Sequence, residues 1–474
     1  MLKKLVRRFL FVVVCLVTLV ALSIAIENWR GKAAWMKYQG ERMAKGDRFE
    51  WSAIVPPPVP DDQNVAAAPV FAELFPKLPE NYRLKPLALP SCANSAGNWS
   101  LGSLENLSGW RAAFTNENLL EALSRYQPLL REVEAALRRP KCKFPLRYED
   151  TFGMNLPHVS VIRKTVQVYR LRALAELEAG QPEAAFADVQ TCLRLADCLK
   201  EEPLLISLLV RASIIEGALQ PVWEGLASHR WTDAQLEAFQ GGFSRQEWLE
   251  HFVLSCQCER MCAYSVTQLC LKDRKQLVEM IRPTNGMTGS QSPSIERFIG
   301  MLFPSGWLYR NNLGIDRWYT EQLIPAIDLR SRRIDARVVL AMDPAFQEMR
   351  TTPYNFLLKI LVPAVGGLSK KVARSQTSGD LATVACALER YRLAQGRLPA
   401  KLDELMPHYL AAIPCDVIDG QPLRYKRTGA DQFMLYSVGW NGIDDGGQLA
   451  FTGEGRNRRL DEAKGDWIWR SQPE

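Results

Sequence analysis

Four cysteines form the group of residues that most resembles a metal site by type and spacing. They are Cys256, Cys258, Cys262 and Cys270. Thiolates bind Zn²⁺ in tetrahedral sets of four, each at about 2.3 Å from the ion. If this stretch is a helix, only Cys258 and Cys262 are neighbours, and Cys256 lies about 21 Å of helical rise from Cys270. One helix therefore supplies two ligands at most, and the spacing favours small buried thiols in a helical core.

Four histidines are the other candidates for metal binding or acid–base catalysis: His158, His229, His251 and His408. No two of them are four residues apart, the spacing that places two imidazoles on one helix face. The sequence also has no Gly-x-Ser-x-Gly nucleophile motif, phosphate-binding loop or dinucleotide fingerprint. Each histidine is therefore interpreted as a surface or hydrogen-bonded core residue. An enzyme is disfavoured, although scattered residues can still assemble a catalytic site in a folded chain.

The stretch Ser378–Gly447 carries the clearest order of local signals. Apolar residues recur at helical spacing over 381–391, where Ser378 can cap the start of a helix and Gly396 can end it. A second, short helix is expected over 402–410. Together these patterns predict a helical first half for the stretch.

The second half of the same stretch has strand-like patterns. Leu423–Arg427 and Gln432–Val438 are separated by four turn-forming residues, which predicts a β-hairpin. A small α+β unit is therefore expected in this part of the chain.

This order of parts resembles the soluble domain of the major (G-type) pseudopilins of type II secretion. The matching segments are Ala387–Arg392, Gly396–Pro399, Leu402–Leu405, Pro414, Asp416, Gly420–Pro422, Tyr425 and Tyr436–Gly439. The apolar run Phe356–Leu368 is similar to the N-terminal half of a pilin helix. In the family, however, the membrane helix and its peptidase site directly precede this domain, whereas here the membrane helix lies near the N-terminus. The resemblance implies a type of domain and leaves assembly into a pseudopilus in doubt.

The pseudopilin resemblance also implies a Ca²⁺-binding loop at the end of the domain. Asn441, Asp444 and Asp445 would supply oxygen ligands, and loop carbonyls and water would complete a set of about six to eight. Two adjacent carboxylates repel each other unless a cation or solvent neutralises them, which is the physical argument for such a site. The alternative is a solvated turn, because tight turns use Gly, Asn and Asp. The small number of side-chain ligands favours the turn.

The composition is that of a globular protein with more than one domain. The chain has 474 residues, of which 47% are hydrophobic and 23% charged. Its net charge of +7 is mild, and part of it lies in residues 1–8. No run of Lys and Arg with interleaved aromatic residues occurs elsewhere, so nucleic-acid binding is not expected.

The N-terminus predicts a membrane anchor. Residues 1–8 form a basic segment without acidic residues, and residues 9–26 are uncharged throughout, long enough to cross most of a hydrocarbon core of about 30 Å. Positive charge is retained in the cytoplasm, so the bulk of the chain is expected to be periplasmic or extracellular. The alternative is a cleaved signal peptide with a site near Ser23–Ala25. The length of the apolar run favours an uncleaved signal anchor.

Residues 27–60 predict a juxtamembrane helix followed by a spacer. The aromatic residues Trp29, Trp35 and Tyr38 alternate with basic residues, which fits either interfacial anchors or a plain solvated helix. The run Pro56–Pro60 is stiff and extended, and we expect it to hold the body away from the membrane.

Residues 61–355 predict a mostly helical body. Val159–Ala179 and Pro182–Leu199 form a helical hairpin, either an ordinary one or, less favoured, a single tetratricopeptide-like pair. The apolar run Pro203–Leu226 is interrupted by charged residues and is interpreted as a buried core helix, not a second membrane span. Further helices are expected over 246–281, 307–324 and 326–341. Residues 448–474 are interpreted as a charged tail, in which Gly453–Glu474 is expected to pack loosely or fray.

The sequence therefore predicts a mainly α protein: an N-terminal transmembrane helix, an irregular helical body and a small α+β C-terminal domain (356–447) with a β-hairpin. The leading hypothesis is a membrane-anchored extracytoplasmic scaffold or interaction protein, in a context such as secretion or envelope assembly, with the lipid bilayer and other proteins as partners. The alternative is an exported hydrolase with its site in the helical body. A deep pocket with converging Asp, Glu or His of shifted pKa would favour the hydrolase. A broad apolar or aromatic surface patch would favour the scaffold.

Overall fold

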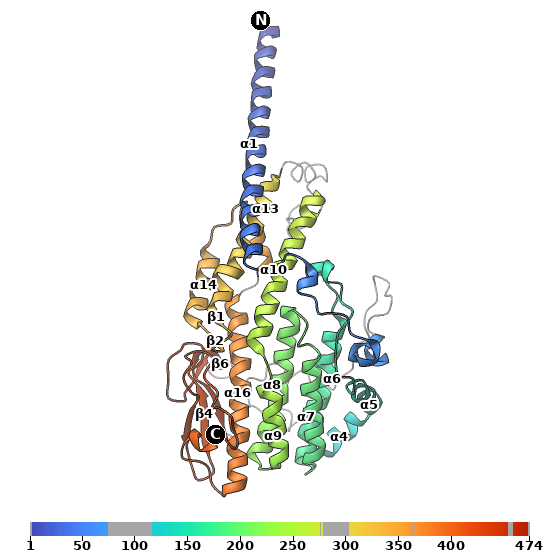
Figure 1. The fold of residues 1–474 in the computed structure, drawn as a ribbon, viewed down its shortest axis with the longest axis vertical. Helices are drawn as coiled ribbons and strands as arrows, with labels where there is room; N and C mark the ends of the chain where they lie inside the picture. Colours follow the sequence, from blue (N-terminus) through green and yellow to red (C-terminus); the bar gives the residue numbers. More distant parts are fainter. Residues whose placement is uncertain are drawn as a thin grey trace.

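The computed structural model describes residues 2–73, 116–274, 276–277, 303–362, 365–453 and 458–472. In these residues the protein has a long N-terminal helix, a helical body and small antiparallel sheets near the C-terminus (Figure 1). The predicted fold class is confirmed.

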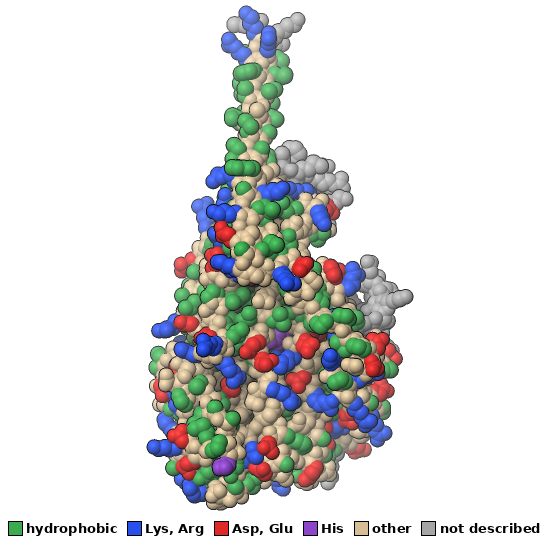
Figure 2. Space-filling model, in the orientation of Figure 1, with side chains coloured by type: hydrophobic (Ala, Val, Ile, Leu, Met, Phe, Trp, Pro, Cys, Tyr) green, Lys and Arg blue, Asp and Glu red, His purple; other side chains and the backbone are tan. Residues whose placement is uncertain are grey.

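One helix, α1 (Leu2–Ala44), covers both the predicted anchor and the predicted juxtamembrane segment. Its outer half projects from the body with its apolar side chains exposed (Figure 2). At 1.5 Å of rise per residue, the apolar run 9–26 is about 27 Å long, close to the thickness of a hydrocarbon core. By length and composition α1 is therefore suited to cross a membrane.

The inner half of α1 packs along α13 (Ser305–Arg317) as part of the body. A Cβ built on Gly31 would lie 2.2 Å from the carbonyl oxygen of Gly306, so the two backbones approach closely only because both residues are glycines. Further along α1, Trp35 and Tyr38 are buried. The prediction of an interfacial or solvated helix is therefore wrong for these two aromatic residues, whose partners lie far away in the sequence.

The proline-rich run Pro56–Pro60 lies along the body. Just before it, the ring of Trp51 packs 5.9 Å from that of Tyr148, and the Lys143 ammonium group donates a hydrogen bond to the carbonyl of Pro56. The prediction that this run separates body and membrane is wrong, because α1 has already entered the body before the chain reaches it.

The body is built from helices of about one to seven turns. They are α2 (Pro69–Ala72), α4 (Asn116–Ser124), α5 (Gln127–Ala136), α6 (Pro157–Glu178), α7 (Pro182–Asp197), α8 (Leu205–Ala227), α9 (Asp233–Ser244), α10 (Trp248–Lys272), α13, α14 (Ala336–Glu348) and α15 (Phe356–Leu361). Short 3₁₀ or π-helical segments lie at η1 (Trp51–Ala53), η2 (Asp61–Gln63), η3 (Val65–Ala67), η6 (Tyr148–Gly153), η7 (Trp318–Leu323), η8 (Ile324–Ala326) and η9 (Leu402–Leu405).

Two of the predicted helical features occur as expected. The hairpin of α6 and α7 turns at Gly180, which has a φ of 74°, and Pro182 opens α7. The apolar helix α8 is long enough to cross a membrane, but most of it is buried inside the body. It is a core helix, as predicted.

Two predicted helices end or break earlier than expected. The helix expected to reach residue 281 ends at Lys272. Part of the helix expected over 326–341 is instead a short hairpin, β1 (Ile327–Asp328) and β2 (Arg333–Ile334). There the Asp328 carboxylate accepts hydrogen bonds from the backbone N–H groups of Arg330 and Ser331, a turn-forming pattern that competes with the helix.

The central helix of the molecule is α16 (Val365–Gln395), and nearly every residue from 372 to 389 is buried. It packs against α8, α9 and α10 on one side and against the C-terminal sheet on the other (Figure 1). The prediction that Ser378 begins this helix is wrong, since Ser378 is buried within it. Gly396, with a φ of 69°, follows its end as expected.

The C-terminal part contains two antiparallel sheets. The first has the strand order β3-β4-β7, formed by β3 (Arg424–Arg427), β4 (Phe433–Ser437) and β7 (Trp467–Arg470), and it includes the predicted hairpin. The second pairs β5 (Leu449–Thr452) with β6 (Arg459–Gly465).

The prediction of a fraying tail after residue 447 is wrong. Trp467 and Trp469 are buried, and Trp469 pairs with Leu435 of β4 across the sheet. The indole N–H of Trp223 in α8 donates to the carbonyl of Arg470, 2.7 Å away. The buried indole rings and the pairing with β4 hold the terminal strand against the sheet, and the hydrogen bond from Trp223 holds it against the body.

Candidate functional site

The structure brings the three predicted Ca²⁺ ligands together in the loop between β4 and β5. The Asn441 amide donates to the Asp445 carboxylate at 3.1 Å. The Asn441 carbonyl oxygen accepts from the backbone N–H of Ile443 at 3.2 Å, and the Asp444 carboxylate accepts from that of Gly446 at 2.9 Å. These are the local side-chain bonds of Asx turns.

A third carboxylate, that of Asp466, holds this loop from outside. It accepts hydrogen bonds from the backbone N–H groups of Asp445 (3.3 Å), Gly447 (2.6 Å) and Gln448 (3.3 Å). Burial raises the pKa of Asp466, although these three donors oppose the change. Sequence reasoning missed Asp466 because it placed this residue in a loose tail, and no local pattern marks it.

Arg424 supplies positive charge to the same loop. Its guanidinium group binds the carboxylates of Asp416, at 3.0 Å, and of Asp419, and it lies 3.7 Å from that of Asp444. We call these four residues the Arg424 cluster. The backbone N–H of Val438 also donates to Asp416, at 2.9 Å. An arginine thus provides part of the neutralisation that a bound cation would give, which supports the solvated turn, and the Ca²⁺ site stays the alternative hypothesis.

No three His, Cys, Asp or Glu side chains gather as a metal-binding group within the described ranges. The four cysteines of α10 are buried along the helix, as the sequence predicted. Of the histidines, His158 and His251 are buried. His158 lies 2.9 Å from the Glu202 carboxylate, and burial lowers the pKa of His251 to about 3. These two residues therefore belong to the hydrogen-bonded core.

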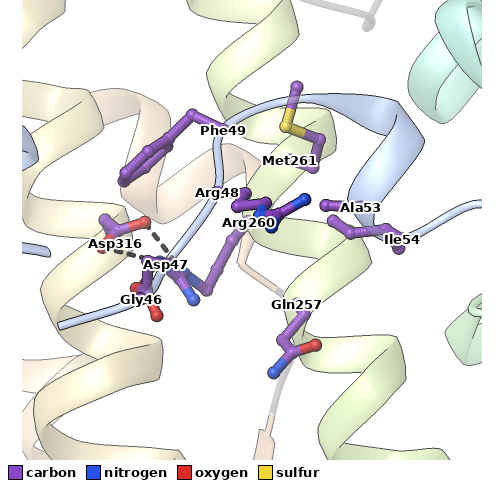
Figure 3. A pocket seen from close by; sticks show the side chains of 10 residues that line it. All are labelled: Gly46, Asp47, Arg48, Phe49, Ala53, Ile54, Gln257, Arg260, Met261 and Asp316. Carbon is purple, nitrogen blue, oxygen red and sulfur yellow. Dashed lines mark hydrogen bonds and ion pairs between the residues drawn. The ribbon is translucent and has the colours of Figure 1, made fainter. Parts of the chain in front are cut away.

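A pocket of about 300 Å³ opens beside the inner end of α1 (Figure 3). It is lined by the segment that follows α1, by α10 and by α13. Among its lining residues are Asp47, Arg48, Phe49, Gln257, Arg260 and Asp316.

Three of the lining residues, Asp47, Arg260 and Asp316, belong to a second arginine–carboxylate group. We call this group, together with Tyr38 and Arg42, the Arg260 cluster. The Arg260 guanidinium lies 2.9 Å from the Asp316 carboxylate and 3.0 Å from that of Asp47 (Figure 3). Arg42 donates to Asp47 at 2.8 Å. The Tyr38 hydroxyl donates to Asp316 at 2.9 Å. The cluster thus joins the inner end of α1 to α10 and α13.

The charges of the Arg260 cluster stabilise one another. Burial by itself would raise the pKa of Asp47, but hydrogen bonds and charges from Arg42 and Arg260 outweigh it and lower that pKa. Burial raises the pKa of Tyr38 to about 12, so its hydroxyl keeps its proton and donates a hydrogen bond to Asp316. Asp47 and Tyr38 thus hold fixed protonation states near neutral pH. The arrangement is therefore suited to fastening helices together, not to transferring protons.

The carboxyl groups with pKa values nearer to neutrality lie elsewhere. Burial raises the pKa of Glu176 to about 8 and that of Glu259 to about 7. Asp188, whose pKa burial also raises, is bound by Arg172 at 2.7 Å in the α6–α7 hairpin. None of these three carboxyl groups lines the pocket. These three carboxyl groups are therefore part of neither the pocket lining nor the Arg260 cluster.

Sequence reasoning missed the Arg260 cluster. Asp47 and Arg260 are 213 residues apart, and Arg260 and Asp316 are 56 apart. Single charged residues at such separations carry no pattern that links them. Comparison of the chain with protein-family models, with curated proteins and with solved structures found no match.

Proposed function

We propose that this protein is a single-pass membrane-anchored scaffold that presents its helical body and C-terminal sheets to protein partners outside the cytoplasm. One observation carries the proposal: α1 is continuous, with an apolar outer half that contacts no other part of the described chain and an inner half packed into the body. Burying the exposed apolar residues in lipid removes them from water at no cost in broken contacts.

The orientation follows from the charge of the outer end of α1. Lys4, Arg7 and Arg8 lie at its tip, and the first acidic residue of the chain is Glu27 on the other side of the apolar run. Figure 2 shows basic side chains at the tip of the apolar shaft. Because basic flanks are retained in the cytoplasm, the body would lie on the opposite side.

A scaffold fits the described geometry better than a hydrolase does. The carboxylates at the pocket are bound by arginines, and Glu176 and Glu259, whose pKa values are raised, lie on α6 and α10 outside the pocket lining. The C-terminal loop, by contrast, exposes Ile443, and the neighbouring strand β5 exposes Phe451. Apolar side chains on a rigidly held loop and strand suit contact with another protein.

The topology is tested by fusing reporters after Glu474 in the full chain. A reporter that is active only outside the cytoplasm should be active, and one that requires the cytoplasm should be silent. The chain should also stay in the membrane fraction after alkaline extraction. The opposite reporter pattern, or release by alkali, would overturn the proposal.

Partner binding is tested with a photo-reactive amino acid in place of Ile443, in cells. We expect a discrete covalent adduct with one other protein. The same amino acid in place of Arg337, whose side chain is 90% exposed on α14, is the matched control and should give none. The experiment is repeated with the photo-reactive amino acid in place of Phe451. If neither position gives an adduct while the chain is anchored in the membrane, the scaffold role of the C-terminal sheets is rejected.

A further inference from the structure

The body begins within one helical turn of the end of the apolar run of α1. Ile26, the last residue of that run, is exposed. The next residue, Glu27, accepts a hydrogen bond from the Tyr354 hydroxyl at 3.2 Å, and the side chain of Asn28 accepts one from the backbone N–H of Gly306 at 2.9 Å. The part of the body at this level therefore has no linker that could separate it from the membrane surface.

The body cannot easily swing away from this position. The close approach of Gly31 and Gly306 fixes α1 against α13, and Trp35 and Tyr38 are buried one and two turns further on. A straight helix thus passes from the proposed span into the packed body. The height of the body relative to the bilayer is set by this packing.

Aromatic and basic side chains surround the foot of the apolar run. We call them the apical surface: Trp29, Arg30, Lys32, Arg310, Arg350 and Tyr354. Trp29 is 72% exposed and Tyr354 is 42% exposed. Figure 2 shows Lys and Arg side chains gathered where the apolar shaft meets the body.

The apical surface is ordered. The ring of Tyr354 packs edge-on against that of Trp307, with centroids 6.1 Å apart, and the Arg310 guanidinium lies 5.5 Å from the Tyr354 ring. The turn that leads to Tyr354 is closed by the Asn355 side chain, which accepts from the backbone N–H of Thr352 at 2.7 Å. These contacts fix Tyr354 beside α1.

We infer that the apical surface binds the headgroup region of the bilayer that α1 crosses, with a preference for anionic phospholipids. This inference rests on the proposed membrane anchoring. Tryptophan and tyrosine rings are stable at headgroup level, where one end of the ring is apolar and the other is wet. Lys and Arg near the surface are attracted to negatively charged lipid. The exposed Lys32 and Arg350 supply that charge next to the exposed aromatic rings. Arg30 lies 3.5 Å from the Glu27 carboxylate and offsets the acidic residue there.

Lipid is the occupant that the geometry favours over a protein. The apical surface is continuous with the apolar outer half of α1, so the same bilayer that covers the outer half reaches the edge of this surface. A protein partner would have to share that space with the headgroups around the helix. The excess of basic side chains complements lipid phosphates directly.

The test uses the full chain with a fluorescent amino acid at position 354, reconstituted in phosphatidylcholine vesicles that contain phosphatidylglycerol. A nitroxide quencher is attached to the headgroup of either lipid in separate samples. We expect strong quenching at position 354 and little at position 443, the control position on the C-terminal loop. Quenching by the anionic lipid should exceed quenching by the zwitterionic lipid, because each surface cation favours anionic lipid by about fivefold.

Charge reversal tests the role of the basic residues. Lys32→Glu/Arg350→Glu should bring the ratio of the two quenching values close to that of the bulk lipid mixture. Lys464→Glu, a charge reversal of a residue that is 75% exposed on β6, should leave the ratio unchanged.

Each outcome separates this inference from the proposed function. Release of the chain by alkali would overturn the proposed membrane anchoring, and with it this inference. Stable anchoring without quenching at position 354 would overturn the inference alone and would leave the apical surface to a protein partner. Equal quenching by both lipids, unchanged by the charge reversal, would overturn the preference for anionic lipid.

Discussion

The Arg260 cluster and the Arg424 cluster use the same chemistry over different distances along the chain. Each has one guanidinium group that binds two or more aspartates. The partners of Arg260 are 56 and 213 residues away, whereas those of Arg424 are five and eight residues away. The first cluster therefore joins α1 to the body, and the second fastens a turn to the strand beside it. Loss of the Arg260 cluster should therefore destabilise the whole fold, whereas loss of the Arg424 cluster should disturb only a loop.

The largest effect is expected from Arg260→Ala. This change leaves two partly or fully buried carboxylates, Asp47 and Asp316, without their shared cation, and should lower the free energy of unfolding by about 3 kcal/mol. Denaturant unfolding of the detergent-solubilised chain measures it. Arg337→Ala, at a side chain that is 90% exposed, is the control and should change stability by less than about 0.5 kcal/mol. Equal effects of the two changes would show that the Arg260 cluster is not a fastening point.

A somewhat smaller loss is expected from Gly31→Ala, which acts on the helix that carries the Arg260 cluster. The added Cβ would meet the backbone of Gly306 at 2.2 Å and should cost about 2 kcal/mol through forced separation of α1 and α13. Gly40→Ala, in the same helix with no atom within 4 Å of its Cβ, should be neutral or stabilising by up to about 1 kcal/mol. Thermal unfolding of the two variants in one detergent makes the comparison. Equal melting temperatures of the Gly31→Ala and Gly40→Ala variants would contradict the close approach of Gly31 and Gly306.

The dependence of folding stability on acidic pH should also differ between the two clusters, with a smaller effect than those of Arg260→Ala and Gly31→Ala. The pKa of Asp47 is lowered, so its contribution to stability is present above the pKa of an unfolded aspartate, about 4, and is lost as pH falls through the folded value. In the Arg424 cluster, arginine outweighs burial to lower the pKa of Asp419, while burial raises that of Asp416, so their contributions oppose each other. Asp47→Asn should therefore flatten the fall in stability below about pH 4. If Asp416→Asn/Asp419→Asn flattened the fall in stability as much as Asp47→Asn does, this distinction between the clusters would be removed.

The smallest expected effect concerns Ca²⁺ at the Arg424 cluster. Calorimetric titration of Ca²⁺ into the full chain should give no saturable heat, because Arg424 lies near Asp444, and Asn441 and Asp445 bind each other. A Ca²⁺ site needs about six to eight oxygens. Saturable binding that disappears in Asp444→Ala/Asp445→Ala would contradict this expectation and would make the pseudopilin resemblance functional.

The position of α16 bears on that resemblance. The helix, the short turn η9 and the β3–β4 hairpin follow one another as the resemblance implies. In this chain, however, α16 is covered by α8, α9 and α10 as well as by the sheet, and its residues from 372 to 389 are almost all buried. We therefore propose a shared type of domain, with α16 held in the body and unavailable for packing into a filament.

The features predicted correctly depend on residues that are close in the sequence. The apolar run of α1, the Gly180 and Pro182 signals between α6 and α7, and the β3–β4 hairpin all arise from periodicity, caps and turns. The terminal strand β7 was missed because its charged neighbours resemble a tail. Only pairing with β4 and burial of Trp469 make it a strand.

The sequence by itself therefore determined that the chain has an apolar helix fit to cross a membrane, a helical body and a C-terminal hairpin, because these follow from local hydrophobicity and backbone preference. Only the tertiary structure decided that α1 continues into the body, that Arg260 joins Asp47 to Asp316, and that Asp466 holds the loop of Asp444. A single charged residue has no periodicity, and its partner is chosen by the packing of elements that are distant in sequence. The same packing places Tyr354 beside Glu27, at the level where a membrane would end.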